Sequence, residues 1–197
     1  MSLVFDQATH SYERDGVRLP SVTQVLKSVG IIDPDKYAPG AAMRGTVVHL
    51  ACQFLDEDDL LESAVPEEIG GYLDAYRKFL AETGWTWTGI EVRMYHETLG
   101  YAGQIDRISQ AAIVDLKSGA EEDWHALQLA GYLGMFQRPM SMERYALHLR
   151  ADGTYGLKQY PRKDFPRDWA VFQSALNIHN WRGKNNGNAT GDNTGRD

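Results

Sequence analysis

Cysteine is almost missing from this chain: Cys52 is the single one among 197 residues. One thiol excludes an internal disulfide, and it excludes a zinc or iron–sulfur site built from cysteines alone. It also fits a protein that works in a reducing compartment, so we expect a cytoplasmic location.

Long hydrophobic runs are absent as well. No stretch approaches the roughly 18 consecutive apolar residues of a membrane helix, and we therefore expect a protein that does not cross a membrane. The opening residues, "MSLVFDQATHSYERDG", show no basic segment followed by an apolar one. We expect no secretory signal there.

An excess of positive charge is missing too, because the formal net charge is −7. Such a field disfavours a protein that coats nucleic acid through charge alone. Acidic residues gather in 56–62, whereas basic residues gather between Arg144 and Arg167. The overall sign therefore leaves room for a nucleic-acid enzyme with a local cleft.

The order of patterns predicts a mixed α/β core wrapped by an N-terminal helical lobe, with a cleft between the two. Ser21 and Gln24 form a capping box for the first helix, and Gly30 ends it. After a short N-terminal strand pair we expect helices over 21–29, 41–55, 66–83, 121–136 and 166–181, and strands over 85–97, 143–150 and 154–161 with a hairpin over 100–119. Residues 1–182 form one domain in this reading, and the polar residues 183–197 form a disordered tail.

The hairpin "GYAGQIDRISQAAIVDLKSG" carries charges where a core strand would be apolar. Side chains alternate along a strand, so Asp115 and Lys117 share a face, and Asp106 on the partner strand can come alongside Asp115. The turn "SQAA" has no Asn-Gly or Asp-Gly signal, which leaves the register open. Two buried carboxylates need a compensating cation, and Mg²⁺ is typical. The alternative is an ordinary ion pair of Asp115 and Lys117 at a strand end.

These residues resemble a known family. "RGTVVH", "GQID", "VDLKSG" and "QLAGY" follow one another as in the RecB-like branch of the PD-(D/E)XK nuclease superfamily, which includes phage and mitochondrial genome maintenance exonucleases. "PSVTQVL" is similar to the N-terminal segment of the exonuclease-like members. The resemblance covers roughly residues 10 to 160. It implies a restriction-endonuclease-like mixed β-sheet core flanked by helices.

The resemblance also implies roles for individual residues. The metal ligands would be His49, Asp106, Asp115 and the main-chain carbonyl of Leu116, holding one or two Mg²⁺ or Mn²⁺ ions. Asp106, Asp115 and Lys117 would be the catalytic set. The residues implied in substrate binding are Arg44, Gln128, Tyr132, Ser21 and Thr23. The CRISPR-associated and some helicase-linked relatives carry four cysteines for an iron–sulfur cluster, so this chain, with one cysteine, resembles the members without a cluster.

The implied activity is that of a Mg²⁺- or Mn²⁺-dependent deoxyribonuclease, acting as an exonuclease on DNA ends or single strands in phage or bacterial recombination or repair. The implied partners are DNA and, in recombination, a recombinase or a single-strand-binding protein. No G-x-x-x-x-G-K-[ST] motif is present, so no helicase motor is built in. Two rival functions stay open: a catalytically silent DNA-end-binding accessory protein, and a restriction-type endonuclease.

Simpler interpretations exist for several of these side chains. His49 can be a hydrogen-bonded histidine of the core or surface, and Ser21 is already explained as a helix cap. Gln128 and Tyr132 lie one helical turn apart, where they can brace the active site, touch the DNA backbone, or only pack. Glu91 stands where some relatives carry an acid at a strand start, but we expect a solvated or core-edge glutamate. Trp124, like the other tryptophans, is expected in the core, although it can also stack on a base.

Overall fold

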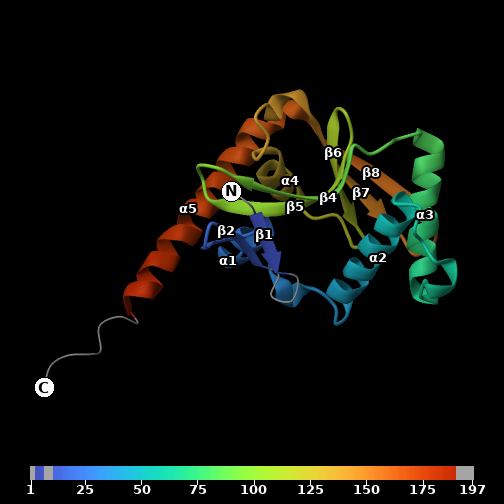
Figure 1. The fold of residues 1–197 in the computed structure, drawn as a ribbon, viewed down its shortest axis with the longest axis horizontal. Helices are drawn as coiled ribbons and strands as arrows, with labels where there is room; N and C mark the ends of the chain where they lie inside the picture. The colour runs from blue at the N-terminus through green and yellow to red at the C-terminus, as the bar shows by residue number, and fades with distance from the viewer. Residues whose placement is uncertain (1–2, 7–10, 190–197) are drawn as a thin grey trace, which may run out of the picture.

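The computed structural model describes residues 3–6 and 11–189, with side chains as far as Lys184. Its centre is a five-stranded sheet in the order β4-β5-β6-β7-β8 (Figure 1). The strands are β4 (Gly89–His96), β5 (Tyr101–Ile108), β6 (Ala112–Lys117), β7 (Glu143–Leu149) and β8 (Tyr155–Tyr160). Only β6 and β7 run parallel to each other. The sheet is therefore mixed, as the sequence predicted.

The N-terminal part holds a second, smaller antiparallel sheet and one helix. The elements are β1 (Leu3–Asp6), β2 (Ser11–Arg14), β3 (Val17–Leu19) and α1 (Val22–Ser28). Ser21 and Gln24 form the predicted capping box through reciprocal side-chain to backbone bonds of 3.1 and 2.9 Å. Gly30 follows the helix with a φ of +79°, a conformation that glycine adopts without strain. The expected strand pair is thus three strands, and the lobe is not purely helical.

Helices cover both faces of the main sheet (Figure 1). They are α2 (Ala41–Asp56), α3 (Glu67–Thr83), α4 (His125–Leu133) and α5 (Phe165–Ala189), with short 3₁₀ turns η1 (Pro34–Lys36), η2 (Glu62–Ala64), η3 (Pro139–Ser141) and η4 (Arg162–Asp164). One hydrophobic cluster joins α1, α4 and α5 to the sheet, and a second joins α2 and α3 to it. Two apolar layers therefore enclose the sheet, and the site described below lies where α2 and α4 approach it.

Three boundaries differ from the prediction. The strand expected over 85–97 begins only at Gly89, because Trp85 and Trp87 leave the strand direction and pack their rings on Phe79. The helix expected over 121–136 is restricted to α4. The last helix runs beyond the expected end, as far as Ala189, so the tail predicted over 183–197 begins inside α5.

The last part of that predicted tail, residues 190–197, lies outside the described residues. Arg182 on α5 donates a hydrogen bond to the carbonyl of Ser28 at 2.6 Å, so this helix is tied to the end of α1. In the part of the chain that the structure describes, no helix is both long and apolar enough to cross a membrane.

Candidate metal centre

The turn between β5 and β6 sets the register of this hairpin, although its sequence lacks a typical turn signal. Arg107 pairs with Val114, and Ile108 pairs with Ile113. The turn then closes through a bond of 2.9 Å from the Ser109 N–H to the carbonyl of Ala112. The Ser109 hydroxyl also accepts from the N–H of Ala111 at 3.4 Å. A serine side chain therefore supports the turn in place of the missing Asn-Gly or Asp-Gly.

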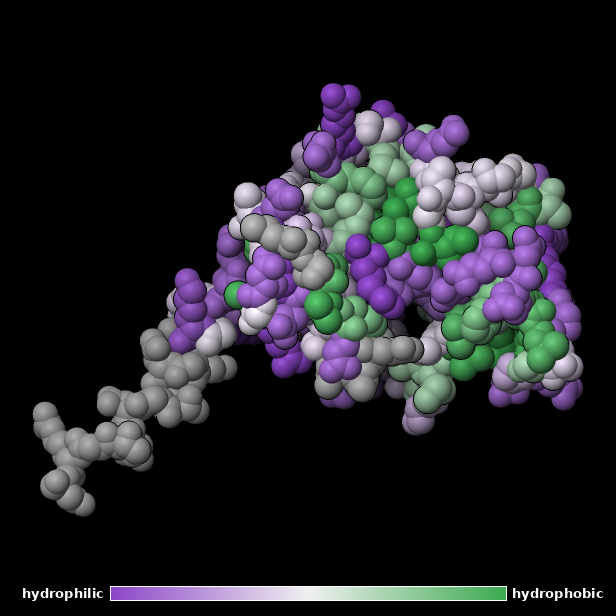
Figure 2. Space-filling view, in the orientation of Figure 1, coloured by the Kyte–Doolittle hydropathy of each residue, from purple (hydrophilic) through white to green (hydrophobic). Residues whose placement is uncertain are grey.

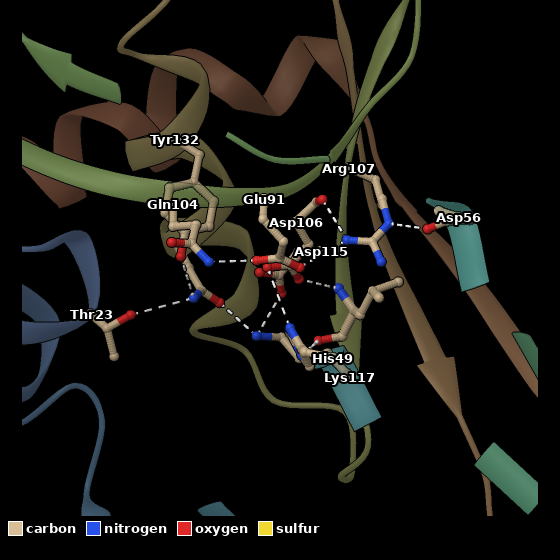
Figure 3. Close-up of polar contacts among 12 residues, drawn as sticks. Thr23, His49, Asp56, Glu91, Gln104, Asp106, Arg107, Asp115, Lys117 and Tyr132 are labelled. Carbon is tan, nitrogen blue, oxygen red and sulfur yellow. Dashed lines mark hydrogen bonds and ion pairs between the residues drawn. The ribbon is translucent and has the colours of Figure 1, made fainter. Parts of the chain in front are cut away.

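The two strands part where the acids stand. Continuing the register beyond Arg107 and Val114 places Asp106 opposite Asp115. There the Asp106 carboxylate, rather than a backbone carbonyl, accepts the N–H of Leu116 at 2.6 Å. Both acids are buried, with exposed fractions of 6% and 3%, and they lie side by side in Figure 3. The prediction that these two carboxylates come together is therefore confirmed by their placement.

His49 reaches this pair from α2. Its Nε2 lies 3.0 Å from the carbonyl oxygen of Leu116, which can only accept, so Nε2 carries a proton. Its Nδ1 lies 3.5 Å from Oδ1 of Asp106. Burial alone would lower the pKa of His49, but the Asp106 carboxylate outweighs it and raises the pKa to about 9. In the protein without metal, a positive charge therefore stands beside Asp106.

Glu91 is a site residue that the sequence analysis set aside. It lies in β4 opposite Asp106 of β5, between the pairs Ile90–Arg107 and Val92–Ile105. Its carboxylate accepts from Gln104 at 2.5 Å and from Arg107 at 2.8 Å, and 11% of its side chain is exposed, so it is held by protein partners rather than solvated.

Glu91 lies close to His49 and Asp106. One donor atom from each of the three residues lies within 4.8 Å of the other two, a spacing that can hold a metal ion. In the sequence, "GIEVRMY" reads as a strand with an apolar and a polar face. Only the register against β5 reveals that the polar face is the site.

Lys117 stands beside Asp115 (Figure 3). Its Nζ lies 2.5 Å from Oδ2 of Asp115 and donates to Oε1 of Gln128 at 2.7 Å. The other end of the Gln128 amide donates to the Tyr132 hydroxyl at 3.0 Å and to the Thr23 hydroxyl at 3.4 Å. Gln128 and Tyr132 are buried, which favours bracing of Lys117 over contact with DNA.

The remaining predicted residues lie around this centre at different distances. Arg44 donates to the carbonyl of Ser118 at 3.5 Å, directly after Lys117, so it stands close to the site. The hydroxyl of Ser21 is engaged in its helix cap, which accounts for it. The ring centroid of Trp124 lies 4.8 Å from the Lys117 ammonium, and its indole N–H donates to the hydroxyl of Tyr37 at 3.1 Å.

Burial disfavours the charged forms of the acids in this centre. Burial raises the pKa of Glu91, and it raises that of Asp115 to about 6 even though Lys117 opposes the shift. Burial acts in the same direction on Asp106, but His49 holds the pKa of this carboxyl below its usual value. Three carboxylates and an imidazole are a donor set that Mg²⁺ or Mn²⁺ accepts, so these residues fit a divalent ion.

The surface is hollowed near this place. Figure 2 shows a dark recess in this face where, in Figure 1, α2 approaches the sheet. His49 enters from α2 and Asp106 from β5, with exposed side-chain fractions of 30% and 8%. The imidazole is thus within reach of solvent, while the carboxylate behind it is nearly closed off.

The sequence matches no family model and no curated protein. Solved structures do match. A protein from Eubacterium rectale described as a candidate exonuclease has a TM-score of 0.49 and 12% identity, over 84% of this chain and 77% of that one. The alkaline exonuclease of Laribacter hongkongensis has a TM-score of 0.37 and 14% identity, over 87% and 94%. Its complex with dAMP gives 0.35 and 15% over the same shares. These likenesses concern the course of the chain, so activity has to be argued from the side chains.

Proposed function

We propose that this protein is a metal-dependent deoxyribonuclease. One observation carries the proposal: donor atoms of His49, Glu91 and Asp106 converge within 4.8 Å, next to the ion pair of Asp115 and Lys117. Carboxylates that hold a divalent ion beside a lysine are the parts that hydrolysis of a phosphodiester requires. Neither an ordinary strand-end ion pair nor a helix cap explains why so many charges share one nearly closed position.

Each side chain has a distinct task in this mechanism. His49, Glu91, Asp106 and Asp115 would hold the ion, with the main-chain carbonyl of Leu116 close by. A bound ion would lower the pKa of a water molecule and offset negative charge on the phosphate. Lys117 is kept in place by Asp115 and Gln128, where its ammonium stabilises the charge that develops on the phosphate oxygens or assists removal of the water proton.

Two finer points follow the motif resemblance. We propose that the enzyme is an exonuclease acting on DNA ends or single strands, and that it serves phage or bacterial recombination or repair in the cytoplasm. Arg44, close to the carbonyl that follows Lys117, is placed to meet a phosphate near the ion. Gln128 and Tyr132 act through Lys117 rather than on DNA.

A nuclease assay tests the proposal directly. Purified protein would be incubated with end-labelled single- and double-stranded DNA in Mg²⁺, in Mn²⁺ and in EDTA. We expect the labelled DNA to be shortened with either metal and to stay intact in EDTA. Binding of DNA ends without shortening in either metal would instead establish an accessory protein. Discrete fragments from a covalently closed plasmid would establish a restriction-type endonuclease.

A further inference from the structure

Arg107 is a fully buried cation directly behind the metal centre. It follows Asp106 in β5, and its side chain has no exposed surface. An arginine in such a position is costly unless its charge and its N–H groups are matched by partners. The identity of these partners suggests what the residue is for.

The guanidinium of Arg107 reaches three elements at once (Figure 3). Its Nε donates to the carboxylate of Asp56, the last residue of α2, at 2.6 Å. Its Nη1 donates to Glu91 on β4 at 2.8 Å and to the main-chain carbonyl of Asp106 at 2.7 Å. Each of these elements supplies one member of the converging group, because α2 also carries His49, two turns before Asp56.

We propose that Arg107 is a positioning residue of the metal centre, and that it sets the spacing of His49, Glu91 and Asp106. The inference rests on the proposed function, since it assumes that these side chains hold a metal ion. Arg107 itself touches neither ion nor DNA. It acts through the groups that it ties together.

Glu91 shows why such a tie is needed. Its φ is +49°, a left-handed conformation that costs a non-glycine residue about 1 kcal/mol or more. Such strain persists only where the surroundings hold the residue, and Arg107 and Gln104 grip its carboxylate from two sides. Carboxylates gathered at one place also repel each other, so without this grip Glu91 would relax away from Asp106.

The contacts of Arg107 with Glu91 and with Asp56 form two arms, one to β4 and one to α2. Asp56, in the α2 arm, is itself fixed by further hydrogen bonds. The hydroxyl of Tyr76 donates to Asp56 at 2.7 Å and accepts from the indole N–H of Trp87 at 2.9 Å. Asp56 therefore connects α2, α3 and the segment before β4 to one guanidinium. A lysine at position 107 would keep the charge, but a single ammonium cannot reproduce the planar fork that serves both arms.

A calorimetric titration with Mn²⁺ alone tests the proposal without DNA or cleavage. The variants are Arg107→Lys and, as a matched control, Arg144→Lys. Arg144 is equally buried, with 1% exposure, and is paired with Asp168 at 2.9 Å away from the ligands. We expect Arg107→Lys to raise the Kd for Mn²⁺ by about 10- to 100-fold, as loss of an outer-sphere partner typically does. Arg144→Lys should leave the Kd within about twofold, even if both variants melt earlier.

The outcomes separate the inference from the proposed function. If the wild-type protein binds no Mn²⁺, both fail. If it binds and Arg107→Lys binds equally well, only the positioning role is wrong, and equal losses in both variants would also overturn it. Should Arg107→Lys not fold, Asp56→Asn removes the negative charge that pairs Arg107 with α2 and is expected to raise the Kd by about tenfold. An unchanged Kd in a folded Asp56→Asn variant would overturn the proposal.

Discussion

His49 and Asp106 face each other with Nδ1 and Oδ1 only 3.5 Å apart, while the far side of the same imidazole donates to the carbonyl of Leu116. Asp106 in turn accepts the N–H of Leu116. The imidazole therefore contacts the carbonyl of Leu116 and also the carboxylate that binds the N–H of the same residue. The space between Nδ1 and Oδ1 favours positive charge, and in the protein without metal a proton supplies it. An ion bound there would have to displace that proton.

Replacing Asp115 by asparagine should abolish metal-dependent cleavage without harming the fold. The pKa of Asp115 is raised to about 6 by burial, so the favourable contribution of this group is present below about pH 4 and is lost as the pH rises through 6. At pH 8 the amide should therefore give an equal or higher Tm in EDTA. A gain of about 1 kcal/mol corresponds to about 2–4 °C. A variant that melts much earlier would instead identify Asp115 as a structural ion-pair partner. Asp74→Asn, on the exposed side of α3, serves as the control for cleavage.

Replacing Lys117 by methionine should separate metal binding from chemistry. The apolar stem is retained, but the charge beside Asp115 is lost. We expect the cleavage rate to fall by about 100-fold or more, since groups that stabilise transition-state charge contribute on this scale. Calorimetry should give a Kd for Mn²⁺ that is unchanged or lower, because a competing cation has gone. Lys158→Met is the control, since that lysine pairs with the exposed Glu121. A wild-type cleavage rate in Lys117→Met would remove Lys117 from the mechanism.

Gly103→Ala tests why β5 carries a glycine three residues before Asp106. An added Cβ would lie 2.8 Å from Cε1 and 3.1 Å from Cδ1 of the Tyr132 ring, which is buried and cannot move freely. Overpacking of this kind costs about 1–3 kcal/mol, so urea unfolding should show a loss in that range. Gln128 is hydrogen-bonded to both Tyr132 and Lys117, so a displaced Tyr132 ring should also lower the rate of DNA cleavage. Gly119→Ala is the matched control, as its Cβ would meet no described atom within 4 Å. Equal stability of the two variants would contradict the contact.

His125 should make the protein sensitive to acid in a defined pH range. It is buried next to Lys117 and His148, and burial is the main cause that lowers its pKa to about 3. Between pH 6.5 and about 3 the unfolded chain therefore binds a proton at this position that the folded protein does not. The free energy of unfolding should fall with decreasing pH by up to about 1.4 kcal/mol per unit. His125→Asn should remove this part of the slope when both proteins are unfolded in urea across the range. Identical slopes would show that His125 is protonated in the folded state.

Local signals in the sequence were sufficient for most elements. The capping box at Ser21 and the glycine after α1 act through neighbours within a turn, and each is found in the structure. Alternation along a strand was enough to predict that Asp115 and Lys117 share a face, whereas the placement of Asp106 beside Asp115 depended on a register that the sequence left open. Their roles in catalysis and metal binding stay predictions.

Glu91 and Arg107 could not be found in this way. Glu91 joins the site through the pairing of β4 with β5, and Arg107 forms an ion pair with Asp56, which lies 51 residues away in the chain. Nothing in "GIEVRMY" distinguishes a solvated glutamate from one held by a buried guanidinium. Pairings at long range depend on packing, and packing is not written in any single segment.

The turn of Ser109 to Ala112 lies at the far end of the hairpin from the acids, yet its length decides where they point. Side chains on paired strands alternate with a period of two, so an extra residue in this turn that slipped the pairing by one would send Asp106 and Asp115 to opposite faces of the sheet. An insertion in this turn, which supplies no ligand, would then disrupt the centre as completely as loss of a ligand. Tolerance to insertion should therefore be lowest in a loop that touches nothing reactive.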